Sequence, residues 1–171
     1  DSDGDGATSL DEFRAGTDPR LATSRPIRAA RPRDFDASGA ADLLWRNAVT
    51  GETAIWLMSA TTAVGTAKLP AGPSWRVTHT GDLDADGRHD ALWRNESTGE
   101  TAAWLMNATG MATSAVLLVD AAWKVTHLGD FDGDGRTDLL WRNDATGTTS
   151  VWLMNGLARG PSATLLANAA W

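Results

Sequence analysis

Short apolar stretches recur along most of this chain, separated by turns rich in glycine, proline and aspartate. Near the C-terminus the apolar runs lie at residues 123–128, 137–143, 149–154 and about 162–168, each of strand length and without the spacing of an amphipathic helix. The middle runs are apolar at nearly every position, so neighbouring sheets are expected to cover both of their faces. The pattern therefore predicts an all-β protein with four strands in each unit.

The same pattern occurs three times at a fixed interval. Trp45, Trp93 and Trp141 are 48 residues apart, and the other six tryptophans form two more sets with this spacing. The copies cover residues 27–74, 75–122 and 123–170 without an insertion, and Trp171 begins a fourth unit. A constant period of this length is typical of repeat architectures. We predict three four-stranded sheets, one per repeat, stacked on one another.

An acidic loop of nine residues lies between the first and second strand of each copy, at residues 34–42, 82–90 and 130–138. Side chains at positions 1, 3, 5 and 9 can turn inward around one ion, the carbonyl at position 7 adds an oxygen, and glycine at position 6 permits the bend. Such an all-oxygen set suits Ca²⁺ better than Mg²⁺ or zinc. The predicted ligands are Asp34, Asp36, Ser38, Ala40 and Asp42; Asp82, Asp84, Asp86, Arg88 and Asp90; and Asp130, Asp132, Asp134, Arg136 and Asp138. Because the first loop has Ser38 at position 5, we expect the weakest affinity there.

Residues 1–13 carry a fourth acidic loop. Its residues fill the ligand positions of a helix-loop-helix calcium site, although the helix that would precede it is missing: Asp1, Asp3, Asp5, Ala7, Ser9 and Glu12, with Gly6 at the turn. The segment EFRAGTDP that follows resembles the calcium-binding linkers of secreted bacterial proteins, similar to dockerin and thrombospondin type 3 repeats. The alternative is a solvated acidic tail. Residues 14–26 have no periodic apolar face and are expected to be a linker.

The repeated loop and its flanking strands resemble a known family. DxDxDGxxD, followed by LLWRN and a Trp-Leu-Met strand, is similar to the FG-GAP or VCBS repeat of integrin-like β-propellers, in a bacterial form, over residues 27–171. The resemblance implies one calcium-stiffened blade per repeat in an extracellular, secreted or cell-surface protein, and hence three four-stranded β-propeller-type blades. Because propellers close with about four to eight blades, these three would form a partial propeller. It also implies adhesion, or a place beside a catalytic domain. A β-trefoil also has three four-stranded repeats and is the alternative fold, but it does not ordinarily carry a calcium hairpin in each repeat.

Composition, charge and the absence of certain motifs limit the classes of function that the sequence supports. The net charge is −7, and most acidic residues lie in the four loops, so the acidity is expected to serve cation binding. The chain has no basic stripe for nucleic acid and no apolar run of the ~18 residues that membrane insertion requires. It also lacks cysteine and the sequence motifs of common hydrolases, and His79, His89 and His127 have no nucleophile at a fixed offset, so we expect no enzyme.

Two sets of repeated residues, the tryptophans and the arginines, are each compatible with ligand binding or with a structural role. Exposed tryptophans would stack on sugar rings, whereas buried ones would pack between blades, and we favour packing. Arg46, Arg94 and Arg142 each precede an asparagine and would form either a polar binding ring or strand-end salt bridges and turn caps. The expected function is a calcium-binding module for adhesion to a glycan or an extracellular protein, and the alternative is a spacer or accessory module in a larger secreted enzyme such as a polysaccharide-degrading one. Neighbouring blades of a longer chain or second copies of this one are the other expected partners.

Overall fold

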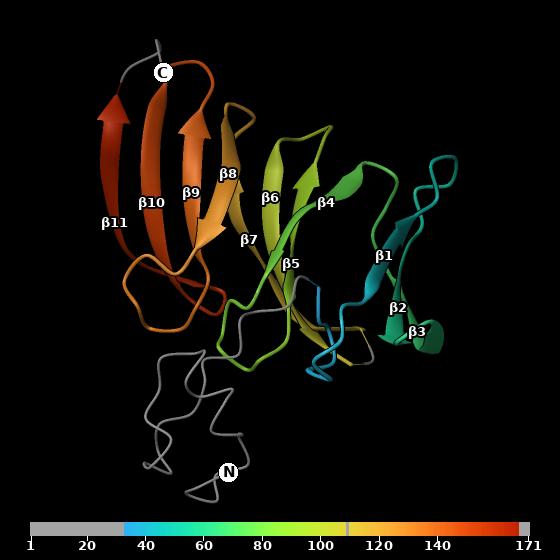
Figure 1. The fold of residues 1–171 in the computed structure, drawn as a ribbon. Coiled ribbons are helices and arrows are strands. Elements are labelled where there is room, and N and C mark those ends of the chain that lie inside the picture. The colour runs from blue at the N-terminus through green and yellow to red at the C-terminus, as the bar shows by residue number, and fades with distance from the viewer. Residues whose placement is uncertain (1–32, 109, 168–171) are drawn as a thin grey trace, which may run out of the picture. The chain divides into compact units, whose positions relative to one another are not determined.

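The structure, a computed structural model, describes residues 33–108 and 110–167 (Figure 1). These residues form eleven strands in three antiparallel sheets, and none of them is helical. Each sheet is a meander in which strands consecutive in sequence are paired. The first contains β1 (Leu43–Arg46), β2 (Thr53–Ser59) and β3 (Thr62–Leu69). The second contains β4 (Trp75–Gly81), β5 (Asp90–Asn95), β6 (Glu100–Asn107) and β7 (Gly110–Val119), and the third β8 (Trp123–Gly129), β9 (Asp138–Asn143), β10 (Thr148–Asn155) and β11 (Ala158–Ala167).

The predicted all-β, blade-type architecture is confirmed. Three separate meanders pack against one another, which differs from the closed barrel of the alternative β-trefoil. The first sheet has three strands among the described residues, because residues 27–32, where its first strand was expected, lie outside them. None of the described segments is a helix of the length and hydrophobicity needed to span a membrane.

The last strand of the third sheet begins earlier than the sequence pattern indicated. The apolar run predicts a strand from about residue 162, after Gly160 and Pro161, yet β11 begins at Ala158. The ladder between β10 and β11 is irregular from Trp152 to Met154, opposite this Gly-Pro pair. A bulge on an edge strand accommodates proline, because no partner needs its missing N–H. The strand therefore continues through the proline.

The core consists of two apolar clusters, one at each junction between successive sheets. The first joins Ile55, Leu57 and Leu69 of the first sheet to Trp93 and other residues of the second. The second cluster repeats the arrangement one blade later, with Leu92, Ala103 and Leu105 of the second sheet against Trp141 and Trp152 of the third. The second and third blades therefore each pack a tryptophan face on the preceding blade, and the first and second blades each pack an aliphatic face on the following one.

The tryptophans confirm the packing interpretation at the two junctions. Trp93 and Trp141 are fully buried, and each lies next to the second tryptophan of its blade, with ring centroids 4.5 and 4.7 Å apart. In the first blade the equivalent pair is formed by Trp45 and Trp56, which are 49% and 41% exposed. The same residue type at the same repeat position is thus buried or exposed according to whether a preceding blade covers it.

Candidate metal centres and a polar pocket

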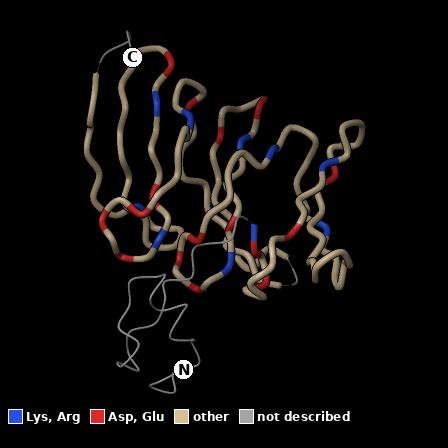
Figure 2. The backbone as a smooth tube through the Cα atoms, in the orientation of Figure 1, with Lys and Arg blue, Asp and Glu red and all other residues tan. Residues whose placement is uncertain are grey.

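The three acidic loops of the described residues lie at the same end of the sheets (Figure 2). They are joined to one another by backbone hydrogen bonds. The N–H of His89 in the second loop donates to the carbonyl of Asp34 in the first at 2.7 Å, and Thr137 in the third donates to Asp82 in the second at 2.7 Å. His89 also accepts the Asp34 N–H at its Nδ1, 3.1 Å away, so this histidine helps to join the two loops. The loops therefore form one continuous row.

Within each loop the backbone wraps around the carboxylate at position 1. In the third loop, Asp130 accepts the N–H groups of Asp134 at 3.1 Å and Gly135 at 2.9 Å. Asp34 and Asp82 accept the corresponding pairs in their own loops. The carboxylate at position 3 accepts the N–H of position 5 at 3.0 to 3.2 Å in all three loops. These bonds hold the carboxylates on the inner side of each loop.

The aspartate at position 9 has a second role that the sequence analysis missed. Asp90 is 1% exposed, and its two carboxylate oxygens accept the N–H groups of Leu83 and Met106, both at 2.8 Å. Asp42 and Asp138 make the same two bonds in their own blades. This side chain therefore ties the loop to the adjacent hairpin. The signal that could have revealed it is the methionine that follows each of these aspartates by 16 residues.

Carboxylate oxygens converge in each loop. One oxygen from each of three aspartates lies within 4.8 Å of the others in the sets Asp34, Asp36 and Asp42; Asp82, Asp84 and Asp86; and Asp130, Asp132 and Asp138. Burial, and then the charges of Asp84 and Asp82, raise the pKa of Asp90 to about 7. Burial and the neighbouring Asp86 raise the pKa of Asp84 in the same way. A hard cation with several oxygen ligands would remove this repulsion, so the residues present fit Ca²⁺.

Arg88 and Arg136, which are predicted to bind the ion through their backbone carbonyls, have side chains that pair with a carboxylate of the same loop. Arg88 forms an ion pair with Asp86 at 2.8 Å, and Arg136 forms one with Asp134 at 2.7 Å. The hydrogen bonds from Arg136 hold the pKa of Asp134 below its usual value. In the first loop the same positions hold Ser38 and Ala40, and the Ala40 N–H donates to the Ser38 hydroxyl. The sequence analysis did not anticipate these ion pairs.

The fourth predicted site lies outside the described residues, and so does the expected linker at residues 14–26. The predicted ligands of this site are Asp1, Asp3, Asp5, Ala7, Ser9 and Glu12.

The repeated Arg-Asn pair serves the connections between blades. Asn95 accepts the N–H groups of Ser97 and Thr98 and so caps the turn after β5, and Asn47 and Asn143 do the same, which confirms the turn-cap interpretation. Arg94 is only 9% exposed, and its guanidinium donates to the carbonyls of residues 120, 121 and 123, which link β7 to β8. Arg46 reaches the preceding link in the same way, through the carbonyl of Pro73. Arg94 is therefore not exposed, as it would have to be to take part in a ring of arginine side chains that binds a ligand.

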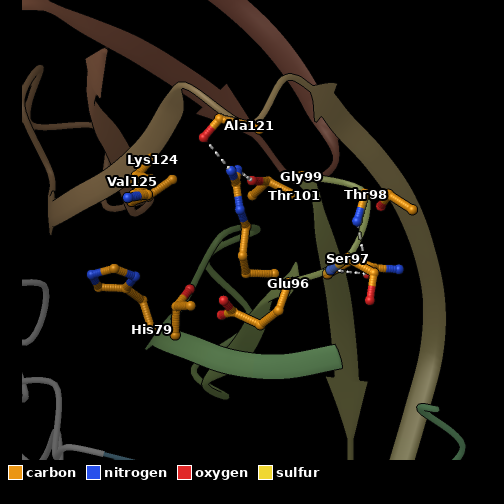
Figure 3. A pocket seen from close by; sticks show the side chains of 12 residues that line it. His79, Glu96, Ser97, Thr98, Gly99, Thr101, Ala121, Lys124 and Val125 are labelled. Atoms are coloured by element: carbon orange, nitrogen blue, oxygen red, sulfur yellow. Dashed lines mark hydrogen bonds between the residues drawn. The ribbon is translucent and has the colours of Figure 1, made fainter. Parts of the chain in front are cut away.

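A polar pocket of about 340 Å³ lies next to this arginine, between the second and third blades (Figure 3). Its polar lining includes His79 from β4, Glu96 from the turn after β5, and Lys124 from β8. Lys124 is ion-paired with Asp144. Burial lowers the pKa of His79, which favours the neutral imidazole. The pocket therefore offers a carboxylate, a neutral imidazole and an ammonium group to a polar ligand.

Comparison with known proteins finds a family that one segment of the chain resembles. Residues 122–154 match the FG-GAP repeat family, a segment that includes β8, the third acidic loop, β9 and most of β10. FG-GAP repeats are propeller blades that typically occur in extracellular or cell-surface proteins and are generally non-catalytic. The third blade is thus similar to an FG-GAP repeat, which supports this part of the predicted resemblance. No curated protein and no solved structure matches the chain.

Proposed function

We propose that this chain is part of an extracellular module, stabilised by calcium, that binds a glycan or a protein. The convergence of three carboxylates in each of the three loops is the observation that carries the proposal. The FG-GAP match at residues 122–154 supports an extracellular module of the adhesion type. VCBS-like character and a bacterial, secreted origin belong to the same proposal.

The proposed role of calcium is structural. Each position-9 aspartate is already bonded to two backbone N–H groups, one in its loop and one in a neighbouring strand. An ion bound to the loop would offset the repulsion among its carboxylates, and the free energy of binding would then add to the free energy of unfolding. Asp34, Asp82 and Asp130 would position the ion, because each of them holds the loop backbone through at least two N–H groups.

Calorimetric titration of Ca²⁺ into the full chain, after treatment with a chelator, tests this role. We expect about three ions for the described loops, with a fourth at residues 1–13, and a rise in Tm. Asp130→Asn should remove one ion from the stoichiometry, whereas Asp144→Asn, an equal charge change outside the loops, should leave it unchanged. No binding, or an unchanged stoichiometry in Asp130→Asn, would overturn the proposed calcium sites.

A spacer or accessory module in a larger secreted enzyme is the second candidate. It is favoured by Arg94, whose guanidinium is committed to the link between blades rather than exposed for a ligand. A glycan array probed with the calcium-loaded chain separates the two candidates. A hit that Glu96→Ala abolishes would support binding at the polar pocket, and an array without hits would favour the spacer.

A further inference from the structure

Asp34, at position 1 of the first acidic loop, is held at its backbone by a residue of the second blade. His89 accepts the Asp34 N–H at its Nδ1 over 3.1 Å and donates its own N–H to the Asp34 carbonyl over 2.7 Å. Both residues are buried, since Asp34 is 6% exposed and His89 is 8% exposed. One residue of the neighbouring blade therefore fixes this aspartate on both sides of its backbone.

The carboxylate of Asp34 is fixed from within its own loop. Its two oxygens accept the N–H groups of Ser38 at 3.1 Å and Gly39 at 2.8 Å. Two bonds from His89 and two from the loop thus determine where these oxygens lie. Because calcium takes its oxygen ligands within about 2.3 to 2.6 Å, a ligand that is already in place loses less freedom when the ion binds.

The junction between the second and third loops lacks the bond to the side chain. Thr137, which corresponds to His89, donates its N–H to the Asp82 carbonyl at 2.7 Å. Among the described residues, the Thr137 hydroxyl makes no hydrogen bond to the Asp82 N–H. The first loop also has one carboxylate fewer than the other two, because Ser38 stands at its position 5. The additional bond therefore occurs at the loop with the fewest carboxylates.

We propose that His89 is a positioning residue of the first calcium site, so that calcium binding by the first loop depends on the second blade. This inference rests on the proposed calcium sites and adds to them a residue that is not itself a ligand. Because Nδ1 of His89 accepts a hydrogen bond, the ring proton lies on Nε2. Without this acceptor the buried N–H of Asp34 would lose its partner, and the ligand would be held less firmly. Loss of such an outer partner typically lowers metal affinity about 10- to 100-fold.

Calorimetric titration of Ca²⁺ into a chain in which only the first loop keeps all its ligands tests this role. Asp5→Asn, Asp82→Asn and Asp130→Asn together disable the other three predicted sites. In this background we expect His89→Ala to weaken calcium binding roughly tenfold, the low end of the range, because the Asp34 carboxylate keeps its two loop bonds. His89→Asn should restore most of the affinity, since its Oδ1 takes the place of Nδ1 as the acceptor.

Two controls separate positioning from a general loss of stability. Thr137→Ala, the corresponding change one loop later, leaves both His89 bonds in place and should not alter the affinity of the first loop. In a second background, where Asp5→Asn, Asp34→Asn and Asp82→Asn leave only the third loop complete, His89→Ala should not change calcium binding. Circular dichroism in chelator verifies the fold of each variant.

His89→Gln is a second variant should His89→Ala fail to fold. It fills most of the space of the ring but places its amide one bond further from the backbone than Nδ1, so it should also weaken binding by the first loop.

The outcomes distinguish the positioning role from the calcium site itself. No binding in the first background with His89 intact would overturn the calcium site of the first loop, and the positioning role with it. Calcium binding that His89→Ala leaves unchanged would overturn the positioning role alone. A loss that His89→Asn does not restore, or an equal loss at the third loop, would also overturn it, because His89 would then act through packing.

Discussion

Ala37 and Ala85, at position 4 of the first two acidic loops, adopt a backbone conformation that Gly133 adopts in the third. Their φ angles are 59° and 63°, against 81° for Gly133. This left-handed conformation costs a residue with a Cβ about 1 kcal/mol or more. No atom lies within 4 Å of where a Cβ on Gly133 would be, so the cost at this position is purely conformational.

We therefore expect Ala85→Gly to raise the free energy of unfolding by about 0.5 to 1 kcal/mol, which is the relief of strain less the added entropy of the unfolded chain. Gly133→Ala should lower it by a similar amount. Urea unfolding of both variants in saturating calcium measures the effect. A destabilised Ala85→Gly would contradict the strain argument.

The pKa of Asp90 predicts how stability without calcium depends on pH. Burial raises this pKa from 3.8 to about 7, so between these values the folded chain keeps a proton that the unfolded chain has released. The free energy of unfolding should therefore fall as pH rises from about 4 to about 7, by at most about 4 kcal/mol.

Urea unfolding in chelator at pH 5 and pH 7.5 measures this dependence. Asp90→Asn, which cannot ionise, should flatten it. Bound calcium should weaken or reverse it, because the ion favours the carboxylate. A chain that is more stable at pH 7.5 than at pH 5 in chelator would be inconsistent with the raised pKa.

Single residues were only partly predictable from the sequence. The aspartates at positions 1 and 3 could be identified from spacing alone, because a calcium loop needs alternating oxygen donors. The bonds of Asp90 to Leu83 and Met106 could not, because they depend on a strand that returns to the loop from later in the chain. The ion pair of Arg88 could not either, because position 7 was considered only for its carbonyl.

At the scale of the loop, an arginine would compete with a bound ion for one carboxylate. The first loop has three carboxylates and no arginine, whereas the second and third have four and one arginine, so their net side-chain charge is equal. The expected weaker affinity of the first loop remains a prediction. The second and third loops bind more tightly only if the ion displaces Arg88 from Asp86 and Arg136 from Asp134, which frees their fourth carboxylate.

Arg88→Ala should therefore raise the calcium affinity of the second loop by roughly three- to tenfold, because Asp86 is released from its ion pair and the loop gains a net negative charge. Arg76→Ala on β4 removes the same charge from an exposed residue outside the loop and should change the affinity much less. Calorimetry at moderate salt compares the two variants. A reduced affinity in Arg88→Ala would show that the arginine supports the site.

The link between the second and third blades depends on Arg94. Its guanidinium donates to three link carbonyls and to the Thr101 hydroxyl, at 2.7 to 3.2 Å. Arg94→Ala should lower the free energy of unfolding by about 1 to 3 kcal/mol, since three partly buried carbonyls lose a charged donor. Arg94→Lys should recover less than half of this loss, because an ammonium group cannot span the same acceptors.

Thermal and urea unfolding measure both Arg94 variants. Lys68→Ala removes a cation from an exposed ion pair with Glu52 and should cost less than about 0.5 kcal/mol. An Arg94→Ala variant as stable as Lys68→Ala would mean that the link is held by other contacts.

Strands and their order were predictable because apolar runs and turn residues are local signals. The limits of β11 were not, because the sequence alone does not show that Pro161 lies on an edge strand opposite an irregular stretch of the ladder. The hydrogen-bond acceptors of Arg94 were not predictable either, because they lie after two further strands, β6 and β7, and meet Arg94 only in the folded chain.

For the whole array, burial at a repeat position depends on the neighbouring blade. Trp93→Ala should lower the free energy of unfolding by about 3 to 5 kcal/mol, because the side chain is fully buried in the first apolar cluster. Trp45→Ala should cost less than about 1 kcal/mol, since this indole is 49% exposed.

Urea unfolding compares the two variants. Equal losses would mean that the Trp45 side chain is covered in solution. The sequence could predict that the tryptophans pack between blades but not which of them lack cover, because all three copies carry the same residue there.

Since the second blade carries both halves of the same junction, the array has a natural unit of growth. An in-frame duplication of any 48 consecutive residues would insert a blade whose tryptophan face meets an aliphatic face and whose loop joins the hydrogen-bonded row on both sides. An insertion of another length would break the register at one border. Arrays of this kind can therefore lengthen or shorten by recombination without new residues having to arise at the seams.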